Sequence, residues 1–92
     1  MARIYQTYNM GEAHVIAALV GHPGEADLCV HRVDSWGLAH GDARWFITRD
    51  KQDATVYVYF GSRGQARVRI CFVDNYSEAG WRGPHPLRGR FG

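Results

Sequence analysis

The sequence has little net charge, a single lysine and no long apolar run. Its 92 residues carry a net charge of +2, and arginine supplies ten of the eleven basic residues. The longest apolar run, VIAALV at residues 15–20, is too short to cross a bilayer. The first ten residues, MARIYQTYNM, lack the basic stretch followed by an apolar run that is typical of a signal peptide. We therefore expect a cytoplasmic protein that neither spans nor binds a membrane.

Motifs that carry chemistry are also scarce. The two cysteines, Cys29 and Cys71, form no Cys-x-x-Cys pair; they could make one disulfide, but without an export signal we expect buried free thiols. No phosphate loop, dinucleotide fingerprint or Gly-x-Ser-x-Gly elbow is present. The histidines lack the i, i+4 spacing of a helical zinc site, so we expect no metal, no cofactor and no catalytic residue. These histidines are His14, His22, His31, His40 and His85.

What the sequence does contain is an alanine that recurs at intervals of 13, 13, 15, 12 and 13 residues. An acid or amide usually precedes it, as do Glu12, Glu25 and Glu78, and a glycine usually stands two residues before. The third unit departs from this pattern, because Leu38 replaces the acid and HGD at residues 40–42 looks like an insertion. The recurring residues are Ala13, Ala26, Ala39, Ala54, Ala66 and Ala79.

Each unit predicts a short helical turn followed by a strand. Pro23 occupies a first helical position, and segments such as TVYVYF and RVRICFV alternate with period two, as strands do. Residues 15–20 fit either a helix or a strand, and we favour a strand because the repeat predicts one. An alanine at each junction indicates close approach of two chain segments. The capping-box pairs are Asn9 with Glu12, Ser62 with Gln65 and Asn75 with Glu78.

We therefore expect one domain, residues 1–92, that is mainly β and is built from about six turn–strand repeats of roughly 13 residues. The repeated phrase, with the ending FVDNYSEAGW and a basic tail, resembles the small bacterial proteins of the seven-crossing (septoil) knot family. This resemblance extends from Ile4 to Leu87. It implies a deeply knotted, monomeric domain and brings no assigned activity or partner. Gln65 and Arg67 depart from the family motif.

The function expected from these observations is a small, stable structural or interaction module without catalytic machinery. An alternative is a His-dependent hydrolase or toxin-like factor, which would use His31 or His85. Its possible partners are Glu25, Asp34 and Arg82, but the repeat acids are interpreted as cap residues. A carboxylate bonded to backbone amides has a lowered pKa and makes a poor general base.

The tail, GWRGPHPLRGRFG, supports a second alternative. Its arginines and rings are suited to single-stranded nucleic acid, which binds by phosphate contact and stacking. We favour the other interpretation, in which Trp81 and Leu87 anchor the tail to the core and residues 88–92 fray. The candidate binding residues of the tail are Trp81, Arg82, His85 and Arg88.

Overall fold

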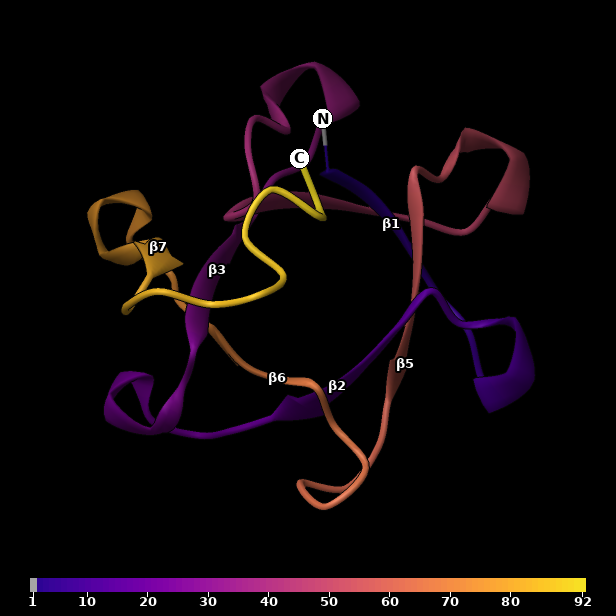
Figure 1. The fold of residues 1–92 in the computed structure, drawn as a ribbon. Helices are drawn as coiled ribbons and strands as arrows, with labels where there is room; N and C mark the ends of the chain where they lie inside the picture. The colour runs from indigo at the N-terminus through magenta and orange to yellow at the C-terminus, as the bar shows by residue number, and fades with distance from the viewer. Residues whose placement is uncertain (1) are drawn as a thin grey trace.

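Six strands of five residues each form the body of the protein. The computed structural model describes residues 2–92, and the strands run around a common axis in Figure 1. The prediction of a strand at residues 15–20 is confirmed. The strands are β1 (Ala2–Gln6), β2 (Val15–Leu19), β3 (Leu28–Arg32), β4 (Arg44–Thr48), β5 (Val56–Phe60), β6 (Val68–Phe72) and the short β7 (Gly80–Trp81).

Single 3-10 turns connect most of the strands and project outward at the corners of the ribbon in Figure 1. Among residues 2–92 no helix is long and apolar enough to cross a membrane. The mainly β fold with short helical turns that the sequence predicts is therefore confirmed. The turns are η1 (Met10–Glu12), η2 (Pro23–Glu25), η3 (Trp36–Leu38), η4 (Lys51–Asp53) and η5 (Tyr76–Glu78).

The strands close into a parallel barrel whose order differs from the chain order. The sheet runs β4-β1-β5-β2-β6-β3, and β3 pairs again with β4 to complete the ring. All pairs among these six strands are parallel. The chain places β1, β2 and β3 in alternate positions, then returns beside β1 and fills the remaining positions with β4, β5 and β6. It thus passes around the barrel twice, and the second circuit interleaves with the first.

The seam between β3 and β4 is only partly paired by these two strands. His31 and Arg32 of β3 pair with β4, whereas Leu28 and Cys29 pair antiparallel with β7. The short strand β7 therefore completes the ring beside the first half of β3.

Alternate side chains of each strand point into the barrel and fill it. Small and medium aliphatic residues predominate, and Trp45 is the one large ring that a barrel strand contributes to the fully buried set. This alternation is the period-two pattern expected of strands. The buried inward residues are Ala2, Ile4, Val15, Ala17, Leu28, Val30, Trp45, Val56, Val58, Val68 and Ile70.

The recurring alanines share one position in the fold. Five of them end a 3-10 turn, and each donates its N–H to the carbonyl of the turn's first residue, as Ala13 does to Met10 at 3.2 Å. Ala66 ends a turn without a 3-10 helix and donates to Ser62. All six are buried or half-buried. A small side chain is therefore used wherever a turn passes into a strand.

The capping-box interpretation holds only in part. Asn9 and Asn75 accept hydrogen bonds from the second residue of their turns, and the Gln65 side chain accepts from the Ser62 N–H. Glu12, however, accepts from the Thr7 hydroxyl, whose oxygen in turn accepts from the Asn9 N–H. The expected bond from the Asn9 N–H to Glu12 is thus replaced by a chain through threonine.

Candidate functional site: the two ends of the barrel

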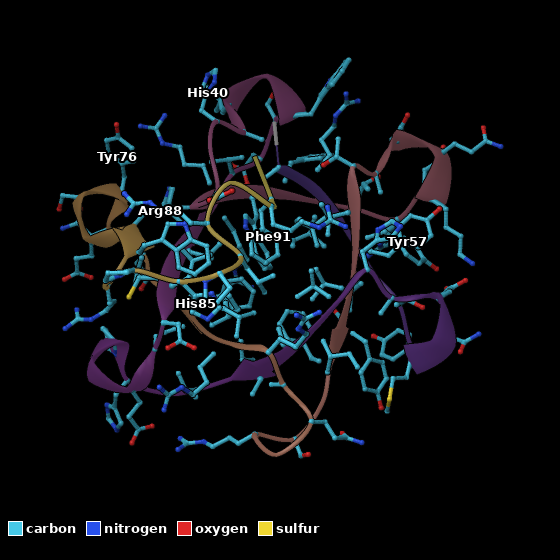
Figure 2. All side chains as sticks on the ribbon, in the orientation of Figure 1. His40, Tyr57, Tyr76, His85, Arg88 and Phe91 are labelled. Atoms are coloured by element: carbon cyan, nitrogen blue, oxygen red, sulfur yellow. The ribbon has the colours of Figure 1, made fainter. Side chains whose placement is uncertain are left out.

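The C-terminal tail closes the end of the barrel at which the strands begin. In Figure 1 the tail crosses the centre of the ring, and in Figure 2 Phe91 lies over that centre. Phe91 is 1% exposed, and its ring centroid lies 5.1 Å from that of Trp45. Leu87 and Trp81 also pack against the core, as the anchoring interpretation expects. The expectation that residues 88–92 fray does not hold, because Phe91 completes the core.

One carboxylate, Asp42, holds the tail in place. Its Oδ1 accepts from the N–H groups of Phe91 at 3.0 Å and Gly92 at 2.7 Å. Its Oδ2 accepts from Trp81 Nε1 at 2.8 Å and from the Gly89 N–H at 2.5 Å. Burial raises the pKa of Asp42, but these four hydrogen bonds outweigh burial and hold the pKa below its ordinary value.

The opposite end, where the strands finish, is open. It contains a hollow of about 790 Å³, a size typical of ligand sites. In parallel α/β barrels and open sheets, ligands bind at the carboxyl ends of the strands. Every barrel strand contributes its last inward residue to this hollow, and the six are Gln6, Leu19, Arg32, Ile47, Phe60 and Phe72.

These residues differ in character from the two layers below them. Leu19 is 55% exposed and Ile47 is 37% exposed, so the hollow has uncovered apolar walls. The rings of Phe60 and Phe72 meet edge to face with centroids 6.2 Å apart. The Arg32 guanidinium lies 4.5 Å from the centre of the Phe72 ring, a cation–π contact. The hollow thus combines apolar surface with one fixed cation.

A residue of β3 and two loop residues after β3 and β6 add polar groups to the hollow. His31, Asp34 and Asp74 line it, and the His31 Nδ1 atom lies 3.2 Å from the Val73 carbonyl oxygen. That nitrogen therefore carries a hydrogen and donates it.

The predicted tail residues lie elsewhere, on the outer side of the closed end. His85 stacks on Trp81 with centroids 5.0 Å apart, and its Nδ1 accepts from the Leu87 N–H. Its Nε2 lies 3.8 Å from Asp27 Oδ2 in a smaller hollow of about 300 Å³, which Arg82 also lines. Figure 2 shows His85 and Arg88 on the same tail segment. The predicted tail residues therefore lie close together, and most of the contacts described for them hold the tail in its folded position.

The hydrolase alternative would use His31 or His85 with a nearby partner. The structure places His31 at the open end, in one hollow with Asp34. It places His85 beside the tail, in another hollow with Arg82. Neither histidine hydrogen-bonds to a described serine, threonine or cysteine. Within residues 2–92 no three His, Cys, Asp or Glu side chains gather as a metal site.

The repeat acids occupy unlike environments. Hydrogen bonds from Thr7 and Lys51 lower the pKa of Glu12. Glu25 pairs with Arg63 at 2.7 Å on the surface, and Glu78 is exposed. None of the three lies in the open hollow.

The two cysteines lie side by side across β3 and β6, in register with each other. Both are buried and free, as the sequence led us to expect. Burial raises the pKa of the Cys71 thiol, which keeps it protonated.

Sequence reasoning missed the open hollow and the Asp42 clamp. A signal for the hollow exists, because five of its six strand residues stand seven positions before a recurring alanine and Phe60 stands six before. Asp42 lies in the HGD insertion, where the repeat gives no guidance.

The geometry defines a class of protein: a small closed barrel whose single chain circles it twice through short capped turns. The family model described as the 7(1) septoil knot domain matches residues 1–82, and the chain belongs to this family. The resemblance seen in the sequence is thereby confirmed. Residues 83–92, which include Phe91, lie beyond the match. No curated protein and no solved structure gave a match.

Proposed function

We propose that this protein is a small knotted interaction module that binds a ligand in the open end of its barrel. The observation that carries the proposal is the difference between the two ends. The tail covers the end where the strands begin, and Phe91 fills it. At the end where the strands finish, Leu19 and Ile47 remain exposed inside a hollow. An apolar concave surface that the chain does not cover itself is typical of a binding site.

A non-catalytic role agrees with the chemistry of the hollow. Its one histidine, His31, is engaged by the Val73 carbonyl, and its one inward cation, Arg32, rests on a ring. These are groups that position a ligand.

The knot of the family supplies a reason for such a scaffold. Interleaved circuits of the chain have to be unthreaded before the barrel can lose its core, so unfolding is expected to be slow. A binding end on such a body would keep its shape through long exposure to proteases and heat.

Binding can be mapped by amide NMR of the labelled protein during titration with a library of small apolar, aromatic and charged compounds. We expect shift changes to cluster at residues of the open hollow, such as Leu19, Ile47 and Phe72. Leu19→Asp should abolish them, while Leu38→Asp, at an equally exposed leucine of η3, should not. Shift changes confined to the tail, or none at all, would refute the proposal.

A second candidate is nucleic-acid binding by the tail. Backbone groups and Trp81 hold the tail to Asp42, so Arg82, Arg88 and Arg90 stay exposed. Fluorescence anisotropy with single-stranded DNA and RNA at several salt concentrations tests it. Binding that weakens steeply with salt and is lost in an Arg88→Gln, Arg90→Gln variant would support it. No binding at low salt would end it.

A further inference from the structure

We infer that the open hollow recognises a compact apolar group carrying a single carboxylate, and that the Arg32 guanidinium binds the carboxylate. The inference rests on the proposed function and names the class of ligand. Such a group occurs in free aromatic or aliphatic acids, including amino acids, and at the carboxyl end of a peptide.

Arg32 is the first reason. The inward positions of the six strands hold aliphatic and aromatic residues, Gln6 and this one charge. Arg32 is exposed at the open end, so its guanidinium is accessible to a ligand in the hollow. One face of the guanidinium is covered by Phe72, and no acid of residues 2–92 lies within ion-pair distance of it. Its N–H edge is therefore free for a bidentate acceptor such as a carboxylate or phosphate.

The walls beside Arg32 define the rest of the ligand. Leu19 and Ile47 expose apolar surface, and Phe60 and Phe72 present an edge-to-face pair in the same hollow. A ring or branched aliphatic group that leaves water for these walls is stabilised in proportion to the apolar area that it buries. The hollow of about 790 Å³ has room for a group of this size.

The rim decides between carboxylate and phosphate. Asp34 and Asp74 line the same hollow, and neither forms a hydrogen bond or ion pair with a described residue. Two carboxylates repel a dianion about twice as strongly as a monoanion. They would tolerate an ammonium group on the same ligand. The site therefore favours a monocarboxylate, with or without a neighbouring amine.

The test uses calorimetry and amide NMR with 3-phenylpropionate, its uncharged amide and phenyl phosphate. We expect 3-phenylpropionate to bind at least tenfold more tightly than the amide or the phosphate. Arg32→Gln should weaken its binding at least tenfold, while Arg67→Gln, which removes the same charge from an exposed position outside the hollow, should leave it unchanged. Circular dichroism melts of both variants control for folding.

Two further probes distinguish the sources of the ligand. Phenylalanine represents a free amino acid, and the peptide Ala-Ala-Phe with a free carboxyl end represents a chain terminus. Tighter binding of the peptide assigns the site to a protein partner, and equal or weaker binding assigns it to a metabolite.

The outcomes that overturn the inference are separable from failure of the proposed function. Equal binding of acid and amide in the hollow, or no effect of Arg32→Gln, refutes the carboxylate specificity alone. If neither these probes nor the compound library shifts residues of the hollow, the binding function fails with it.

Discussion

Replacing Asp42 with asparagine should release the tail from the barrel. The carboxylate accepts four hydrogen bonds, two at each oxygen. Asparagine keeps one oxygen and places an NH2 group against the other two donors, whichever way the amide is turned. A hydrogen bond to a charged group contributes about 1.5–3 kcal/mol. Because Asp42 is only half-buried, water replaces part of the loss, and we expect tail docking to weaken by about 2 kcal/mol in total.

Hydrogen exchange measures this loss directly. The amides of Gly89, Phe91 and Gly92 donate to Asp42, so their exchange reports undocking of the tail. A loss of 2 kcal/mol corresponds to about thirtyfold faster exchange. Asp34→Asn, which removes an exposed acid from the open end, should change these rates less than threefold. Unaltered protection in Asp42→Asn would refute the clamp.

The same clamp predicts a pH dependence. Since the folded pKa of Asp42 lies below its unfolded value, the carboxylate stabilises the docked tail above the unfolded pKa of about 3.9. That stabilisation is lost as the pH falls through the folded pKa. Tail amides of the wild-type protein should therefore lose protection below about pH 4, and those of Asp42→Asn should lack this acid-dependent component.

Three other predictions concern packing. Ala26→Leu should lower the free energy of unfolding by about 1–3 kcal/mol, and Ala66→Leu should lower it by less, because Ala26 is buried and Ala66 is half-buried. Chemical denaturation, measured by both unfolding and refolding, would contradict this if neither variant lost stability. Gly92→Ala should raise the hydrogen-exchange rates of the tail amides about fivefold, because an added Cβ would lie 2.4 Å from the Gly41 carbonyl carbon. Unchanged exchange rates would show that residue 92 can move away from Gly41 without undocking the tail. Cys71 faces away from the barrel interior and is covered in a second apolar cluster with Val20 and Ala26, so it should react with a thiol reagent only when this cluster opens locally; rapid labelling of the folded protein would show that the cover opens readily.

Much of the fold can be predicted from the sequence because its determinants are local. Alternation in TVYVYF specifies a strand, and Pro23 begins a turn, from interactions within a few residues. The recurring alanines locate each turn-to-strand junction for the same reason.

The strand order is not local. Val15 of β2 pairs with Val58 of β5, and nothing in either repeat unit specifies that partner. Similar units can interleave or follow one another with the same local pattern. The family resemblance implied a knotted chain but gave no strand order.

The candidate site, too, combines features that local sequence predicts with contacts that depend on the long-range strand order. Arg32 and Phe72 occupy equivalent places in their repeats, yet their contact depends on β3 and β6 being neighbours. Asp42 depends on a tail that returns from almost fifty residues away. Fraying was expected there because chain ends are poorly ordered unless they are tied down, whereas one buried ring and one carboxylate suffice to order the segment.

The return of β3 to β4 has a consequence for how copies of this protein behave when crowded together. Each of the six strands of the ring already has a neighbour on both sides, and β7 pairs with the part of β3 that β4 does not reach. Open sheets carry a row of unsatisfied backbone groups along which foreign strands can add, the first step of many fibrils. A ring offers no such row, so concentrated solutions of this protein should resist fibril growth for as long as the ring stays shut.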